Sequence, residues 1–254
     1  MERADEVPPA TTQVDFEARV QAVYEALLGP GDVAVDVGAH LGRHLIPIAQ
    51  AIAPTGRVLA FEPLPMCRES LARRFEQDLA DLASLVTVHG CALGDISGET
   101  EFVIARDAIA YSGLRERVYD VPTALDRIPI EVRRLDEFTR DLSSLSYVKI
   151  DAEGGELHIL RGGSETLARF RPAVTFEFGA NSIGNYGVTV LEMGDFWLER
   201  GYRLYDILGR PLATREAFAD SATAQHVWDY VALPAEAGSL PREVFPQFGA
   251  SRET

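Results

Sequence analysis

The stretch VAVDVGAHLGRHLIPIAQAIAPTGRVLAFEP, from Val33 to Pro63, decides the fold of this chain. Its first run, Val33 to Val37, is short and β-branched, as in a strand buried on both faces, and Arg57 to Phe61 repeats this composition about 24 residues later. Two such strands joined by a helical segment form a right-handed βαβ unit. The stretch therefore predicts an α/β fold built on a parallel sheet.

A glycine turn and an acid occupy the two strand ends of this unit. Gly38 and Gly42 lie between the first strand and the helix, where backbone N–H groups at a positive helix end can face a ligand. Glu62 lies at the carboxyl end of the second strand, where a carboxylate can bind both hydroxyls of a ribose. These positions predict a nucleoside-cofactor site; the alternative is an ordinary strand–helix turn with an incidental acid.

The spacing of the turn distinguishes between nucleoside cofactors. Its sequence, Gly38-Ala39-His40-Leu41-Gly42, lacks the G-x-G-x-x-G fingerprint of dinucleotide sites. Asp36 precedes the turn, and its negative charge would repel a pyrophosphate. S-adenosyl-L-methionine has a ribose, an ammonium and a sulfonium but no phosphate, so spacing and charge favour it over NAD.

Composition limits the classes of partner. The 254 residues are enough for one α/β domain with an ample core, and 39 acidic against 24 basic residues give a net charge of −15. Nucleic acids and anionic membranes are bound through excess positive charge, so neither is expected as the main partner. Small-molecule or glycan substrates fit this charge better, and composition does not indicate the oligomeric state.

The ends of the chain and its cysteines bear on location. We expect residues 1–14 to be a flexible segment without the features of a signal peptide, 15–233 to be a single domain, and 234–254 to be a loosely held tail. Cys67 and Cys91 are too few for a disulfide framework and are expected to be reduced and buried. With no apolar run of about 18 residues in the sequence, a cytoplasmic protein is expected.

Further elements follow from apolar periodicity. Asp15 is expected to cap a helix, Pro47 to kink or delay the helix after Gly42, and one long helix to run from Met66 to Leu82. The expected further strands and helix are Val86–His89, Leu145–Asp151, Ala173–Phe178, Val190–Arg200 (helix), Tyr202–Leu208 and Val227–Leu233.

Irregular or alternating segments complete the pattern. Glu99 to Ile104 and Ile130 to Arg134 alternate like paired, partly exposed strands. The stretch from Asp107 to Asp126 is polar and without period, as in a lid or a substrate contact. Acceptor specificity is expected there and in Asn181 to Val188.

A family resemblance rests on VDVGAHLG, AFEP, ALGD, YVKIDAEGGELHILRGG and FEFG, in that order. Together they resemble the FkbM family of S-adenosylmethionine-dependent methyltransferases over about Gly31 to Leu208, with Lys149 to Glu156 as the most specific segment. The resemblance implies a Rossmann-like, seven-stranded class I methyltransferase with a mostly parallel sheet and helices on both faces. The family commonly has Asn where this chain has His40.

The resemblance also implies roles for individual residues. The ribose would be held by Glu62, and the acids Asp151, Glu153 and Glu177 would lie at strand ends beside the methyl group. With the adenine wall and the methionine end added, the implied cofactor site is Asp36, Gly38, Ala39, His40, Gly42, Glu62, Pro63, Cys91, Ala92 and Asp151.

Several residues have more than one interpretation. Catalysis is assigned to Asp151, Glu153, His40 and Glu177, against strand-end capping or turn packing as the structural alternatives. Glu156 and Lys149 are expected to support the local structure, and His44 to lie in turn packing or on the helix surface. His89 and His158 are assigned to structure. Three converging acids could hold Mg²⁺, but no His-rich or closely spaced carboxylate loop marks a metal site, so Mg²⁺ is not favoured.

The sequence leads to one functional hypothesis and two alternatives. The hypothesis is an S-adenosylmethionine-dependent O-methyltransferase that acts on a hydroxyl of a sugar, polysaccharide or secondary metabolite. The alternatives are a non-catalytic protein that keeps the fold and binds a ligand, and an NAD-type oxidoreductase, for which the glycine turn is unsuited.

Overall fold

A seven-stranded sheet forms the centre of the computed structural model, which describes residues 14–116, 123–180, 182–238 and Val244. The strand order is β3-β2-β1-β7-β8-β10-β9. The bounds are β1 Val33–Val37, β2 Arg57–Phe61, β3 Val86–His89, β7 Tyr147–Ile150, β8 Ala173–Glu177, β9 Tyr202–Asp206 and β10 Asp229–Pro234. The predicted class I fold is confirmed.

Strand direction changes at one place in this sheet. The five strands from β3 to β8 pair in parallel, for example Val35 with Leu59 in β1 and β2. The last strand, β10, inserts between β8 and β9 and is antiparallel to both. Its first residue, Asp229, therefore lies opposite Glu177, the last residue of β8. The first residues of β10 therefore lie at the same edge of the sheet as the carboxyl ends of the parallel strands.

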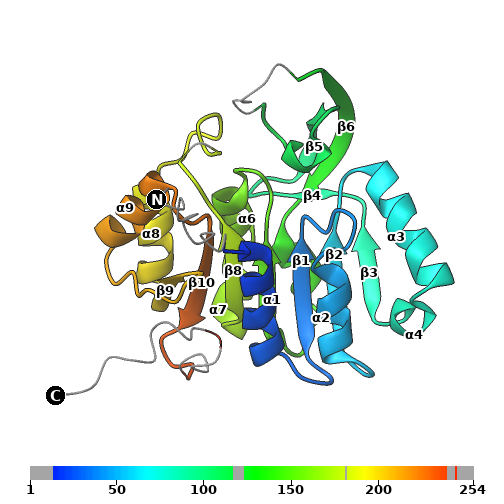
Figure 1. Cartoon of the computed structure of the whole chain (residues 1–254), viewed down its shortest axis with the longest axis horizontal. Coiled ribbons are helices and arrows are strands. Elements are labelled where there is room, and N and C mark those ends of the chain that lie inside the picture. Colours follow the sequence, from blue (N-terminus) through cyan, green and yellow to red (C-terminus); the bar gives the residue numbers. More distant parts are fainter. Residues whose placement is uncertain (1–13, 117–122, 181, 239–243, 245–254) are drawn as a thin grey trace, which may run out of the picture.

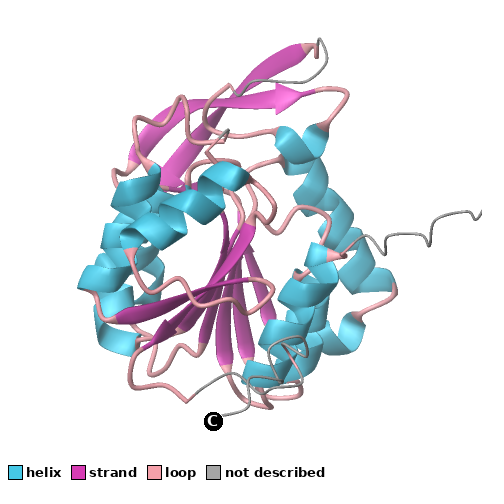
Figure 2. Ribbon diagram, turned by 60° about the vertical axis from the view of Figure 1, so that its left-hand side comes forward, coloured by secondary structure: helices cyan, strands magenta, loops and turns pink. Residues whose placement is uncertain are grey.

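Helices cover both faces of the sheet (Figure 2). Asp15 caps the first helix by accepting a hydrogen bond from the Ala18 N–H at 3.0 Å, as expected, and Thr189 and Glu192 form a capping box on another. The bounds are α1 Phe16–Leu27, α2 Leu45–Ile52, α3 Pro65–Gln77, α4 Ala80–Ala83, α5 Leu135–Thr139, α6 Glu156–Gly162, α7 Ser164–Phe170, α8 Val190–Glu199 and α9 Arg215–Ala224. Within the described residues, none of these helices is long and apolar enough to cross a membrane.

Two helix predictions need comment. Helix α2 begins at Leu45, so Pro47 lies in its first turn, where its missing N–H costs no intrahelical bond. The long helix expected from Met66 to Leu82 is wrong, because α3 ends at Gln77 and the short α4 follows. Leu79 still packs against the core, so the apolar spacing continues although the helix is interrupted.

A second, three-stranded sheet lies above the main one (Figure 1). Its order is β4-β6-β5, with bounds β4 Ala92–Leu93, β5 Gly98–Ala105 and β6 Leu125–Arg133. The antiparallel pairing of β5 with β6 confirms the paired strands expected from alternation. A single 3₁₀ turn, η1 (Ile109–Tyr111), follows β5. Residues 117–122 of the predicted lid lie outside the described residues, as do 1–13 and most of the tail.

Candidate active site

A cavity of about 830 Å³ opens at the carboxyl ends of the parallel strands, the usual ligand site of open α/β sheets. Its volume suits a cofactor together with a small acceptor. The predicted site residues that line it are Asp36, Gly38, Ala39, His40, Glu62, Pro63, Cys91, Ala92, Asp151, Glu153 and Glu177. One predicted residue, Gly42, is not part of the lining.

The glycine turn is held close to the neighbouring strands. The N–H groups of Gly38 and Ala39 both donate to the carbonyl of Phe61, at 3.0 and 3.1 Å. Gly38 has a φ of +81°, and a Cβ there would lie 1.9 Å from the Asp151 carbonyl oxygen. Only glycine fits this position. At Gly42, with a φ of +86°, a Cβ would meet the Leu71 side chain at 2.8 Å, so a glycine here permits close packing of the turn on α3.

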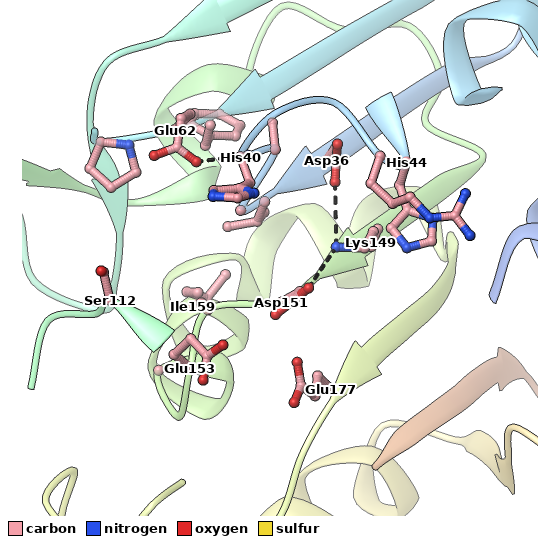
Figure 3. Close-up of a pocket in the computed structure, with 18 of the residues that line it drawn as sticks. Asp36, His40, His44, Glu62, Ser112, Lys149, Asp151, Glu153, Ile159 and Glu177 are labelled. Atoms are coloured by element: carbon pink, nitrogen blue, oxygen red, sulfur yellow. Dashed lines mark hydrogen bonds and ion pairs between the residues drawn. The ribbon is translucent and has the colours of Figure 1, made fainter. Parts of the chain in front are cut away.

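Glu62 is oriented by the backbone on either side of it. One carboxylate oxygen accepts the N–H of His40 and the other the N–H of Leu64, both at 2.8 Å (Figure 3). Burial raises the pKa of Glu62, and these two bonds oppose that shift. Each oxygen keeps a further lone pair for a ligand hydroxyl. The predicted ribose acid is therefore fixed in place before a ligand binds.

The segment after β3 supplies an apolar part of the lining. Cys91 and Ala92 are buried there, and both cysteines of the chain are free, as expected. Burial raises the pKa of the Cys91 thiol to about 11, so it is a neutral packing group. Together with Leu64 and Phe102, this segment offers a surface suited to the flat face of an adenine.

The one lysine in the sequence joins the two acids beside the turn. Lys149 Nζ lies 3.1 Å from Asp151 Oδ2 and 3.9 Å from Asp36 Oδ1 (Figure 3). Burial would lower the pKa of Lys149, but the charges of Asp151 and Asp36 outweigh it and raise that pKa. Asp36 is 1% exposed, and neither of its carboxylate oxygens has a hydrogen-bond partner among the described residues.

Three carboxyl groups gather beyond this pair. One oxygen from each of Asp151, Glu153 and Glu177 lies within 4.8 Å of the others. Burial and the neighbouring Asp151 charge raise the pKa of Glu177 well above its usual value. Burial also acts to raise the pKa of Asp151, but the Lys149 charge and bonds with Glu177 and Lys149 lower it. Asp151 is thus the ionised member and Glu177 the protonated one, and the expectation that Mg²⁺ is not favoured stays a prediction.

Two of the support residues behave as predicted. Glu156 accepts hydrogen bonds from the N–H groups of Ala152 and Gly154, both at 3.0 Å, and so fixes the turn that carries Glu153. Glu153 itself has a φ of +56°, a conformation that such bracing helps to maintain. His158 lies between the Asp95 carboxylate and the Tyr186 carbonyl, which is a structural position.

The histidines of the glycine turn differ from each other. His40 lines the cavity with a φ of 45°, and burial lowers its pKa, which keeps the imidazole neutral and able to accept a proton. The prediction of a packed turn or helix-surface position for His44 is wrong in part, because its side chain is 5% exposed and bonded between Tyr24 and Glu17 of α1. Glu17 is 27 residues away from His44 in the sequence, so the residues around the turn do not indicate this contact.

Four of the lining residues that were not predicted come from segments near the two ends of the domain. Phe16 and Glu17 come from the start of α1, Asp229 is the first residue of β10, and Trp228 directly precedes it. Burial, with the charges of Asp151 and Glu17, raises the pKa of Asp229 to about 7. No local motif marks these positions, because only the insertion of β10 beside β8 brings them to the cavity.

The two irregular segments expected to bind the acceptor differ. From the first, Ile109, Tyr111, Ser112 and Leu114 line the cavity. Asn181 lies outside the described residues, and none of residues 182–188 lines this cavity. Instead Asn185 bonds to the Glu116 carbonyl, so this second segment supports the first from outside.

The cavity fits S-adenosyl-L-methionine on its own geometry. Glu62 can receive ribose hydroxyls, and the buried Asp36 carboxylate lacks hydrogen-bond donors that a ligand ammonium would supply. The glycine turn lines the cavity, but the expectation that its N–H groups face a ligand is wrong, because those of Gly38, Ala39 and His40 already donate to Phe61 and Glu62. The lining after β3 is apolar. These residues would hold the ribose, the methionine end and the adenine respectively.

Comparison with known proteins agrees with this geometry. The family described as Methyltransferase FkbM domain matches residues 36–204. Methyltransferase sdnD from Sordaria araneosa is 27% identical over 158 residues, which are 52% of this chain and 60% of that protein. 2-O-methyltransferase NoeI from Sinorhizobium fredii is 25% identical over 187 residues, or 67% of this chain and 72% of that protein. The first of these relatives thus extends well beyond the part that this chain matches.

A solved structure shares the fold. Methyltransferase FkbM from Methylobacillus flagellatus KT aligns with a TM-score of 0.51 and 18% identity, and the alignment covers 82% of this chain and 47% of that one. The family match, which covers more than half of the chain, confirms the resemblance to the FkbM family and supports S-adenosyl-L-methionine as the cofactor.

Proposed function

Because the chain belongs to the methyltransferase FkbM domain family, we propose that it transfers a methyl group from S-adenosyl-L-methionine to a hydroxyl oxygen. The acceptor is a sugar, a polysaccharide or a secondary metabolite. The NoeI relative is named a 2-O-methyltransferase, which supports transfer to oxygen.

The observation that carries this proposal is the paired set of acids across the cavity. Glu62, held by two backbone N–H groups, is suited to a ribose at one end. At the other end, Asp151 is kept ionised beside Lys149. An acid suited to a ribose and a carboxylate able to accept a proton line one cavity, which supports transfer to a hydroxyl.

Positioning contributes more to the reaction than proton removal. The bound cofactor supplies a methyl group on a sulfonium, which is a good leaving group. Orientation of two reactants can lower a barrier by about 7–11 kcal/mol, whereas a general base adds about 10²–10⁴-fold. The rigid turn at Gly38 and the fixed Glu62 serve orientation.

Asp151 is the proposed proton acceptor for the hydroxyl. Its lowered pKa keeps the carboxylate ionised at neutral pH, and Lys149 stabilises that charge. Glu177, with a raised pKa, is proposed to hold a proton that it shares with Asp151. Glu153 and the neutral His40 line the same cavity and are the alternative bases.

Calorimetric titration with S-adenosylhomocysteine, with NADH as the control, tests the proposal. Micromolar binding of S-adenosylhomocysteine without binding of NADH is the expected result. Binding of NADH alone would replace the methyltransferase function with that of an oxidoreductase. Binding of neither would favour a non-catalytic protein that keeps the fold.

A further inference from the structure

Four residues form a wall of the cavity that we call the acceptor wall: Phe16, Glu17, Trp228 and Asp229. All four lie outside residues 36–204, the part that matches the family. Glu62, Gly38 and Asp151, which serve the cofactor and the reaction, all lie inside that part. The acceptor wall is therefore built by the chain's own flanking elements, α1 and β10.

The two elements meet at the cavity through rings and charges. The ring centroids of Phe16 and Trp228 are 5.9 Å apart with their planes tilted by 47°. Trp228 is 45% exposed, although an indole ring is a large apolar surface. Glu17 and Asp229 lie close enough for the charge of one to act on the other. Aromatic faces and carboxylates thus occupy the same wall.

Carboxyl groups outnumber basic groups in the lining of the cavity. Its carboxyl groups are Asp15, Glu17, Asp36, Glu62, Asp151, Glu153, Glu177 and Asp229. Among the described lining residues, the side chains with a permanent positive charge are Arg43 and Lys149. Lys149 is paired with Asp36 and Asp151, and Arg43 donates to Gln21 of α1 at 3.3 Å. Glu177 holds a proton and the pKa of Asp229 is raised to about 7, whereas the hydrogen bond with His44 lowers the pKa of Glu17. Glu17 is therefore the ionised acid of the wall at neutral pH, and a bound cation would favour ionisation of Asp229 beside it.

We propose that the acceptor wall binds a ring-shaped acceptor that carries an ammonium group, and that it selects against acceptors with a carboxylate or phosphate. This inference rests on the proposed methyl transfer and names the class of acceptor. A cation is attracted both by the face of an indole and by a carboxylate, whereas an anion is repelled by both. A ring presents an apolar face to the Phe16–Trp228 pair while its ammonium reaches Glu17 and Asp229.

Tryptophan fluorescence can report on this wall directly. The chain has two tryptophans, of which Trp197 is fully buried and Trp228 lies on the wall. We would titrate the protein, saturated with S-adenosylhomocysteine, with the methyl glycosides of glucosamine, glucose and glucuronic acid. Compared with the glucoside, the glucosaminide carries an ammonium at C2 in place of a hydroxyl, and the glucuronide carries a carboxylate at C6 in place of the hydroxymethyl group. Loss of the signal in Trp228→Phe would assign it to this residue.

The expected order of affinity is the ammonium ring first, then the neutral ring, then the carboxylate ring. The first should bind about tenfold more tightly than the last, since a charge-assisted contact replaces a repulsion. In a double variant, Glu17→Gln with Asp229→Asn, the order should disappear. Asp220→Asn removes an exposed acid outside the cavity lining and is the matched control. Thermal unfolding of each variant checks that it is folded.

Three results would overturn the inference: equal or tighter binding of the carboxylate ring, an unchanged order in the double variant, or no binding of any ring. An acceptor carboxylate bound by Arg43 would give the first of these. If S-adenosylhomocysteine binds normally in calorimetry while the rings show no charge order, only the acceptor class is wrong. If S-adenosylhomocysteine itself fails to bind, the proposed methyl transfer fails as well.

Discussion

The cofactor side and the acceptor side of the cavity are built in different ways. On the cofactor side, the glycine turn and Glu62 are joined by short backbone hydrogen bonds within one βαβ unit. On the acceptor side, the acceptor wall comes from α1 and β10, which are far apart in sequence. The first side is thus specified locally, and the second only by the completed fold. This difference separates a site for a common cofactor from a surface that can vary with the acceptor.

Lys149 lies between the two sides, and of the substitutions considered its replacement should lower the free energy of unfolding the most. In Lys149→Met, Asp36 and Asp151 would lose their shared counter-charge in a buried setting. Removing one partner of a buried ion pair lowers the free energy of unfolding by about 3–5 kcal/mol. Urea denaturation at neutral pH measures this loss. Arg57→Met, an exposed cation on β2, is the control, and a loss in Lys149→Met no larger than the control's would contradict the ion-pair interpretation.

Gly38→Ala tests how rigid the cofactor side is. The backbone at this position has a positive φ, which alanine adopts only with strain. The added Cβ would also lie 1.9 Å from the Asp151 carbonyl oxygen. Backbone strain and overpacking should together lower the free energy of unfolding by about 2–4 kcal/mol. Gly98→Ala, where a Cβ would meet no atom within 4 Å, is the matched control. Equal stability of the two variants in the same denaturation assay would show that the turn is more tolerant than its geometry indicates.

Glu62→Ala tests binding on the cofactor side. The loss of charge-assisted bonds to the ribose should weaken S-adenosylhomocysteine binding by about 1.5–3 kcal/mol, or about 10–150-fold. Calorimetry measures the affinity, with Glu69→Ala, an exposed acid on α3, as the control. Unchanged affinity in Glu62→Ala would exclude the ribose role.

Asp229→Asn should have the smallest effect of these substitutions. It should change how the free energy of unfolding depends on pH. The pKa of Asp229 is raised to about 7 by burial and by Asp151 and Glu17, whereas an unfolded aspartate titrates near about 3.9. Between about pH 4 and about pH 7 the native state holds a proton that the unfolded state has lost, so the free energy of unfolding falls as pH rises.

The variant lacks this titration, so its stability should fall less over the same range. Lys149 and Glu177 face the same group and remain in the variant, and Glu156, with a pKa of about 7, keeps part of the slope. Denaturation at about pH 5 and about pH 8 measures both slopes. Identical slopes for the wild type and Asp229→Asn would show that Asp229 is ionised in the free protein.

Features of the fold that are specified locally could be predicted from the sequence, and those that depend on the completed fold could not. The strands of the βαβ unit and the Lys149 to Glu156 segment were recognisable because their signals, apolar runs, glycines and acids, are local. The break between α3 and α4 was not recognisable from the sequence, because Leu79, which lies between the two helices, still packs against the core. Periodicity records which face is buried and not whether the helix is continuous.

The site was predictable to a similar extent. Of the predicted site residues, Gly42 alone is outside the lining, because its φ and packing on Leu71 serve the helix. His44 and Asp229 were misplaced or missed because their partners come from α1 and from the antiparallel insertion of β10. Neither contact has a signature within a few residues of the side chain.

The burial of Lys149 also determines how the protein reacts with amine reagents. It is the one lysine in the sequence, its side chain is 7% exposed, and it is held as an ammonium by two carboxylates. Acylating reagents need a neutral, accessible amine, so the folded protein presents no reactive lysine. Labels, crosslinkers and surface attachment that target lysine would therefore leave the cavity unmodified.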